Sequence, residues 1–206
     1  MILKVFFCGM LAAIPVALLE LGFLDWIDSF PLPFALSQIL YIFLGVALVE
    51  EVFKYLVVRQ MVLKSPEFDE PIDAILYMII TALGFAAAEN LLILFPLSTP
   101  FQFFETFFVS GFRFVGATFL HALVSGLVGF FLALSFSKSQ NRFKLVASGI
   151  AIAVVLHGLY NLSIMKIEGG LRFIIPIIIL ISLAIFLSLA FKKVKKLKSI
   201  CLPTDR

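Results

Sequence analysis

This chain of 206 residues contains six long apolar stretches, and each is long enough to cross a lipid bilayer. An α-helix rises ~1.5 Å per residue, so about 20 apolar residues span the ~30 Å hydrocarbon core. Charged residues make up only 14% of the chain, whereas soluble domains average about 25%. We therefore expect an all-α integral membrane protein. Its six spans should lie near residues 3–24, 38–60, 73–95, 114–136, 145–165 and 172–191.

The chain should form a single membrane domain over residues 1–206, because neither a linker nor an internal repeat divides it. Within this domain, the polar motifs described below fall in residues 38–165. Residues 192–206 form a lysine-rich tail. A nucleic-acid partner is not expected, since no aromatic or glycine-rich pattern accompanies these lysines.

Basic residues are distributed unevenly between the loops, and this predicts the orientation of the bundle. The loop after the first stretch is acidic, with Asp25 and Asp28, whereas basic residues follow the second, fourth and sixth stretches. Because cytoplasmic loops carry an excess of Lys and Arg, we expect both termini on the cytoplasmic side of the membrane. The positive charge would then face anionic lipid head groups.

A Phe-rich segment at residues 101–113 does not fit a simple span. Joined to the following helix, it would make a rod of about 36 residues, or ~54 Å, which exceeds the membrane thickness. Phenylalanines recur in it at helical spacing, with polar residues between them. We expect an interfacial or re-entrant helix on the outer side, with a short seventh span as the alternative.

Three ionisable residues, Glu50, Glu51 and Lys54, interrupt the second apolar stretch. Each ionised side chain near the centre of a membrane helix costs on the order of 2.5–3.5 kcal/mol. Lys54 follows the two glutamates by four and three residues, so it can reach both on one side of the helix. A buried ion pair that only stabilises the bundle is one interpretation. We favour a catalytic or transport site, because ionisable groups within the membrane usually mark function.

Further polar residues interrupt the next three stretches. Glu89 and Asn90 lie in the third, His121 in the fourth, and His157 with Asn161 in the fifth. His157 and Asn161 are four residues apart and therefore share a helix face. The chain has no other histidine, so two histidines within apolar helices argue against packing as their only role.

Small residues accompany these polar groups at helical spacing. Ser125 and Gly129 continue a stripe from His121, and Gly84 and Ala88 precede Glu89. Small residues allow membrane helices to approach closely. The polar groups are therefore expected to point into the bundle rather than into lipid.

Two kinds of chemistry can use this set of side chains. A carboxylate held beside a second acid or an imidazole in a low-dielectric cavity can act as a general base on water that attacks a peptide carbonyl. His157 and Asn161 could then donate hydrogen bonds to the oxyanion. Alternatively, glutamates and histidines could bind a divalent metal such as zinc; the candidate ligands are Glu50, Glu89, His121 and His157. The chain lacks the His-Glu-x-x-His helix of common zinc proteases, so we favour a site without a cofactor.

The motifs also occur in a recognisable order. Residues 50–54 match Glu-Glu-x-x-Lys and residues 85–90 match Phe-x-x-x-Glu-Asn, followed by Arg113, His121 and the segment 157–161. In this order the chain resembles the PrsW-type intramembrane proteases, which belong with the CAAX prenyl-endopeptidase and bacteriocin-processing superfamily. The resemblance covers about residues 38–165.

This resemblance implies an endopeptidase embedded in a prokaryotic cell membrane, where bacterial members cut anti-sigma factors. If the roles of the family's motif residues are carried over to this chain, Glu50 would be the general base, and His157 and Asn161 would be the oxyanion donors. Glu51 and Lys54 would orient and neutralise Glu50, and Asn90 and Arg113 would support the site. Glu89 stands where the prenyl-protein endopeptidases have a histidine, and His121 is the candidate to take that histidine's role.

The expected partners are a membrane-anchored protein substrate and the lipid bilayer. The main alternative function is a proton- or ion-coupled transporter in which Glu50, Glu51 and Glu89 relay cations. No inverted repeat and no matching pair of broken helices supports a transporter. A non-catalytic membrane scaffold is the third interpretation.

Overall fold

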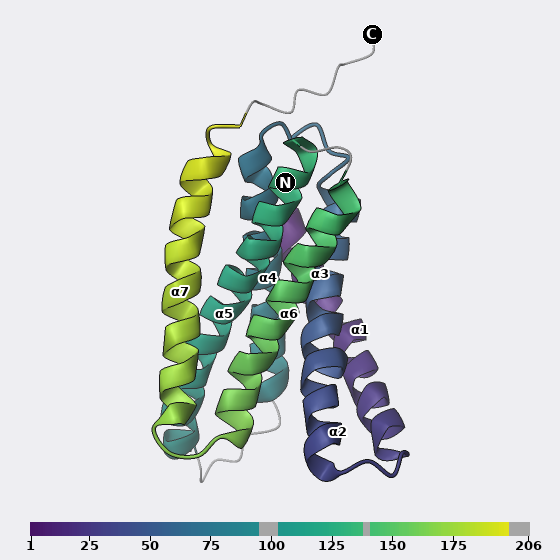
Figure 1. Ribbon diagram of the computed structural model, residues 1–206, viewed down its shortest axis with the longest axis vertical. Coiled ribbons are helices and arrows are strands. Elements are labelled where there is room, and N and C mark those ends of the chain that lie inside the picture. The colour runs from purple at the N-terminus through teal and green to yellow at the C-terminus, as the bar shows by residue number, and fades with distance from the viewer. Residues whose placement is uncertain (95–102, 138–140, 198–206) are drawn as a thin grey trace.

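The computed structural model describes residues 1–94, 103–137 and 141–197, with the backbone alone for residues 93–94, 103–113 and 137. This part of the chain is all-helical (Figure 1). The elements are α1 (Ile2–Asp28), α2 (Phe34–Leu40), a π-helical segment η1 (Tyr41–Leu48), α3 (Val49–Met61), α4 (Pro71–Leu94), α5 (Phe103–Ser137), α6 (Arg142–Lys166) and α7 (Leu171–Val194).

Among the described residues, six helical segments are long and apolar enough to cross a membrane. One of them, Phe34–Met61, joins α2, η1 and α3 into a single span. The other five are Ile2–Asp28, Pro71–Leu92, Phe114–Phe136, Arg142–Lys166 and Leu171–Val194. The predicted all-α membrane bundle is thereby confirmed, with span bounds close to those expected from the sequence.

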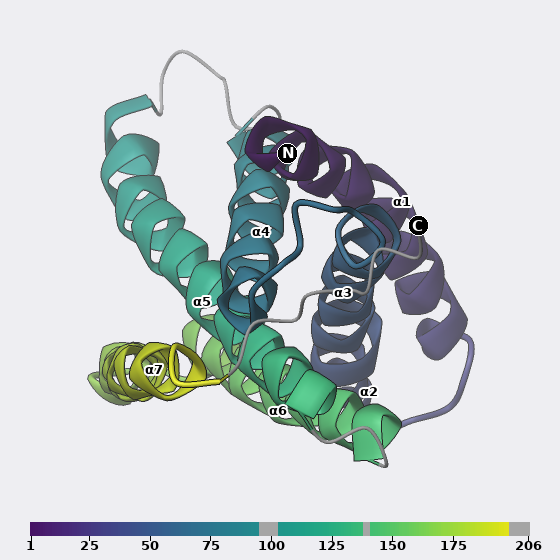
Figure 2. The same ribbon diagram turned by 90° about the horizontal axis from the view of Figure 1, so that it is seen from above.

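The Phe-rich segment is helical from Phe103 onward, but it is not a separate helix. It forms the first part of α5, which runs without a break to Ser137 over 35 residues, or about 52 Å. Figure 2 shows α5 running obliquely across the bundle. The apolar span found within α5 is Phe114–Phe136, so the earlier turns continue the same helix beyond that span. Residues 101–102 lie outside the described part of the chain.

Close backbone contacts hold α4 against its two neighbours. A Cβ atom added at Gly84 would run into the backbone of Phe6 in α1. One added at Gly129 of α5 would lie 2.6 Å from the carbonyl oxygen of Ala74 in α4. The approach expected from the small residues is therefore present at both positions, and it brings α4 and α5 together at the centre of the bundle.

The outermost helices, α1 and α7, lie on opposite sides of this centre (Figure 2). Both present large apolar side chains outward, among them Leu11 and Leu18 on α1 and Ile178 and Ile185 on α7. Lipid solvates such a surface, whereas water would not. The buried ionisable side chains are instead gathered inside, where α3, α4, α5 and α6 meet.

Candidate active site

Lys54 is the centre of a buried cluster of ionisable groups. Its Nζ atom donates hydrogen bonds to Oε2 of Glu50 at 2.9 Å and to Oε1 of Glu51 at 2.8 Å. All three side chains are at most 3% exposed. Both glutamates lie in the first turn of α3, and Lys54 lies one turn later, so the helix period itself brings the ammonium to both carboxylates. The π-helical segment η1 ends directly before this turn.

His121 of α5 extends the cluster to α4. Its Nδ1 lies 2.7 Å from Lys54 Nζ, and its Nε2 lies 2.8 Å from Oε2 of Glu89. An ammonium group only donates, so Nδ1 must accept, and the ring hydrogen must sit on Nε2. His121 therefore donates to Glu89 through Nε2 and links two carboxylate-bearing helices.

His157 of α6 contacts the second glutamate. Its Nδ1 lies 3.1 Å from Oε1 of Glu51, which means that Nδ1 carries a hydrogen and donates it to the carboxylate. The hydroxyl of Ser125 donates to the other oxygen of Glu51 at 3.1 Å. With both oxygens occupied, Glu51 is fixed in place. The free ring nitrogen of His157, Nε2, faces Oε2 of Glu50 at 4.0 Å.

A cavity of about 290 Å³ lies beside this cluster. Among its polar lining residues are six that the sequence analysis named, from α3, α4, α5 and α6: Glu50, Glu89, Asn90, His121, His157 and Asn161. Glu51 and Lys54 are not among the described residues that line it. A buried water needs only about 10–15 Å³ of such volume, so the cavity can hold water and part of a peptide chain.

The structure brings together all but one of the candidate residues from the sequence. Asn161 reaches the cavity wall, one helical turn after His157. Asn90 also lines the cavity, and its Nδ2 donates to Oγ1 of Thr118 at 3.2 Å. Arg113 is the exception, because its side chain lies outside the described part of the structure.

Sequence reasoning gave no role in the site to four residues that belong to it, although one of them, Phe85, begins the motif at residues 85–90. Glu20 of α1 and Tyr41 of η1 line the same cavity. Ser125 was noted only as a small residue, yet its hydroxyl binds Glu51. The ring of Phe85 lies 4.6 Å from Lys54 Nζ, a favourable cation–π distance. For Glu20 a signal existed, since it is the one charged residue in the apolar stretch between Lys4 and Asp25.

The donor atoms have the composition of a metal site. Glu50, Glu51, His121 and His157 each offer a ligand atom, and these atoms lie within 4.8 Å of one another. Glu51 thus joins this group in place of Glu89, which we had named from the sequence.

The space between these donor atoms is nevertheless taken by a cation. The ammonium of Lys54 lies 2.7–2.9 Å from a donor atom on three of the four residues. A divalent ion would need the same atoms and would be repelled by the ammonium. While Lys54 holds this position, the cluster does not fit a metal ion.

Comparison with known proteins gives a consistent set of matches. The family model described as PrsW family intramembrane metalloprotease matches residues 1–189. Protease PrsW of Oceanobacillus iheyensis is 26% identical over 182 residues, which cover 88% of this chain and 78% of that protein. Protease PrsW of Geobacillus kaustophilus is 37% identical over 120 residues, covering 58% of this chain and 49% of that protein.

A third relative, Protease PrsW of Bacillus subtilis, is 26% identical over 138 residues, covering 66% of this chain and 60% of that protein. The matched region therefore spans between about half and about four fifths of these relatives. No solved structure gives a significant match.

Proposed function

Since the chain belongs to the PrsW family of intramembrane proteases, we propose that it is an endopeptidase that cleaves a membrane-anchored protein with a water molecule activated by Glu50. The observation that carries the proposal is the position of Glu50. Its carboxylate is the member of the glutamate pair that lines the cavity, while Lys54 and two histidines surround its Oε2 atom.

In the proposed reaction, Glu50 takes a proton from water in the cavity as the water oxygen attacks the peptide carbonyl carbon. The carbonyl oxygen becomes an oxyanion. When the tetrahedral intermediate collapses, the C–N bond breaks, and Glu50 returns the proton to the departing amine. The net change is addition of one water across one peptide bond.

His157 and Asn161 are the proposed oxyanion donors. Asn161 offers its side-chain amide from the cavity wall. Because His157 already donates from Nδ1 to Glu51, it can donate to an oxyanion only from a protonated Nε2. The negative charge of Glu51 stabilises that imidazolium, as the buried carboxylate of a catalytic triad does for its histidine. Glu51 would thus stabilise the charged histidine, whereas Glu50 would activate the water.

The family's description contains the word metalloprotease, which implies a metal ion. The contacts of Lys54 with Glu50, Glu51 and His121 argue against that chemistry in this arrangement. We therefore assign the activation of water to Glu50 and the positioning of Glu50 to Lys54. His121 and Glu89 complete the network, and His121 takes the place of the histidine found in the prenyl-protein endopeptidases.

The proposed substrate is a single-span protein resembling an anti-sigma factor, as in the bacterial members of the family. The test incubates purified protein in lipid nanodiscs with membrane-anchored peptides and maps new termini by mass spectrometry. Glu50→Gln keeps the shape of the side chain but removes the base, so cleavage should fall below about 1% of the parent rate. Glu168→Gln, an exposed glutamate after α6, is the matched control and should cleave normally.

Cleavage by Glu50→Gln at more than a few per cent of the parent rate would show that Glu50 is not the base. Because the same change weakens an ion pair with Lys54, each variant is first checked for a monodisperse elution profile. Absence of cleavage by the parent protein, together with proton or cation flux in liposomes, would favour the transporter.

We also propose that both termini are cytoplasmic in a bacterial cell membrane. The start of α1 and the end of α7 lie at the same end of the bundle (Figure 1), and this end carries most of the basic residues, with Lys166 and Arg172 at the other end. In a background without native cysteines, Ser29→Cys should react with an impermeant maleimide on intact cells. Glu67→Cys, in the opposite loop, should react only after permeabilisation. The reverse pattern would overturn the orientation.

A further inference from the structure

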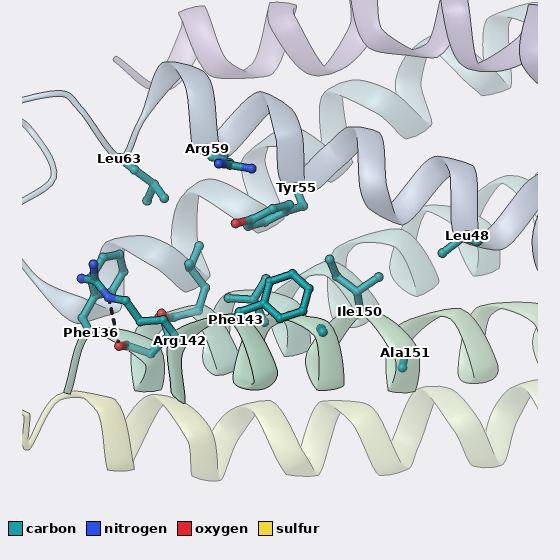
Figure 3. Close-up of a pocket in the computed structure, with 13 residues that line it drawn as sticks. Leu48, Tyr55, Arg59, Leu63, Phe136, Arg142, Phe143, Ile150 and Ala151 are labelled. Carbon is teal, nitrogen blue, oxygen red and sulfur yellow. Dashed lines mark hydrogen bonds between the residues drawn. The ribbon is translucent and has the colours of Figure 1, made fainter. Parts of the chain in front are cut away.

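A second cavity, larger than the one at the candidate active site, lies between α3, α5 and α6. Its volume is about 590 Å³, and it shares no lining residue with the first cavity. Most of its wall is apolar, with Leu48 of η1 and Ala151 of α6 at one end. Figure 3 shows Tyr55 projecting into its middle from α3. We call this cavity the α3–α6 groove.

Two arginines define the other end of the α3–α6 groove. Arg59 extends from α3 on one wall, and Arg142 lies beside Phe136 on the opposite wall (Figure 3). Arg142 is held in place by two contacts: its Nε donates to the carbonyl oxygen of Ser135 at 3.3 Å, and its guanidinium lies 5.0 Å from the ring centre of Phe136. Within the described part of the chain, neither guanidinium pairs with a carboxylate.

The dimensions of the groove fit an amphiphile. Leu48 and Arg59 are eleven residues apart, or about 16 Å along the helix, and Arg142 and Ala151 are nine apart, or about 14 Å. The guanidinium groups lie near the last turn of α3 and the first turn of α6, where the two spans leave the apolar layer. The wall therefore changes from cationic to apolar along the depth of the membrane.

We propose that the α3–α6 groove binds one anionic phospholipid, with its phosphate between Arg59 and Arg142 and an acyl chain along the apolar wall. Two guanidinium groups at head-group depth, neither paired with a carboxylate among the described residues, are complementary to a phosphodiester, which arginine can bind through two N–H groups. Basic pockets between membrane helices are recognised sites for anionic head groups. Because none of the described residues that line the groove is acidic, a zwitterionic head group finds no partner among them for its ammonium.

The test is native mass spectrometry of the delipidated full-length protein. It is titrated with dioleoyl phosphatidylglycerol or, as the neutral comparison, dioleoyl phosphatidylcholine. The parent should bind one phosphatidylglycerol at least 10-fold more tightly than phosphatidylcholine. Each arginine near the membrane surface contributes roughly a factor of five, so Arg59→Gln with Arg142→Gln should weaken that binding about 25-fold. Lys144→Gln removes an exposed charge on α6 outside the groove and should leave binding unchanged.

A variant of the apolar wall tests the acyl chain separately. Ala147→Trp places a large side chain in the groove and keeps both arginines in the sequence, and it should also weaken phosphatidylglycerol binding at least 10-fold. If inorganic phosphate displaced the lipid and Ala147→Trp bound normally, the site would be one for free phosphate, and the proposal would be wrong.

Three further results would overturn the proposal. The first is equal binding of the two lipids by the parent protein. This result does not depend on whether any variant folds. The second is an equal loss of binding in Lys144→Gln, which would mean that only overall charge matters. The third is normal lipid binding in the arginine variants with a raised KM for peptide cleavage, which would make the groove a contact for the protein substrate.

Discussion

Replacement of Lys54 by methionine tests the centre of the site most directly. Methionine keeps an unbranched apolar stem of similar length but removes the ammonium that binds Glu50 and Glu51. The two pairs are 2.9 and 2.8 Å long and fully buried. At an effective dielectric constant near 20, each pair corresponds to about 6 kcal/mol of Coulomb attraction.

The net loss is smaller than this sum, because burial of the three charges already costs several kcal/mol per ion. When one partner of a buried pair is removed, the loss is typically about 3–5 kcal/mol, since the remaining charge is left without compensation. We expect Lys54→Met to lose stability in this range. Lys192→Met, which removes an exposed lysine on α7, should change stability by less than about 0.5 kcal/mol.

The assay is reversible unfolding in mixed micelles of dodecyl maltoside and SDS, followed by far-UV circular dichroism. A double-mutant cycle that combines Lys54→Met with Glu51→Gln isolates the energy of the Lys54–Glu51 ion pair. Removal of both charges should cost less than the sum of the single changes, with a coupling energy of about 1–3 kcal/mol. Two results together would refute the idea that the ammonium compensates the carboxylates. The effects of Lys54→Met and Glu51→Gln on the free energy of unfolding would add, and Lys54→Met alone would lower it by less than 1 kcal/mol.

Lys54→Met also tests whether the cluster can bind a metal ion. If the ammonium occupies the space between the ligand atoms, the parent should contain no stoichiometric zinc, and Lys54→Met should gain about one zinc per chain. Inductively coupled plasma mass spectrometry after dialysis against zinc measures both. One zinc per chain in the parent, lost in His157→Ala, would show that Lys54 leaves its position to admit an ion.

Two further changes address the oxyanion site and the packing of the bundle. Asn161→Ala should lower kcat about 10²–10³-fold with little change in KM, because an oxyanion donor acts in the transition state; a change confined to KM would contradict the assignment. Gly84→Ala should destabilise the fold by about 1–3 kcal/mol, since its Cβ meets the backbone of Phe6, whereas Gly22→Ala, with open space around it, should be neutral or stabilising. Equal effects at the two glycines, measured by the same unfolding assay, would rule out the α1–α4 contact as the cause.

The local part of the site could be predicted from the sequence because it depends on helix period alone. The spacing of Glu50, Glu51 and Lys54 brings the ammonium to both carboxylates in any α-helix. Likewise, the length and apolarity of six stretches require six membrane helices, since backbone polar groups in lipid must be satisfied within each segment. The polar residues of four separate spans could also be expected to converge, because lipid cannot solvate them.

Tertiary packing decided which residue has which neighbour. Glu50 and Glu51 are adjacent in the chain but point about 100° apart on the helix, so the packing of α3 determines that one lines the cavity and the other binds Ser125 and His157. Glu20 reaches the same cavity only because α1 lies against α3 and α4. No local pattern encodes such an approach between distant segments. The sequence therefore determined that this protein would bury charged groups in a membrane, and the crossing of its helices determined how those groups are paired.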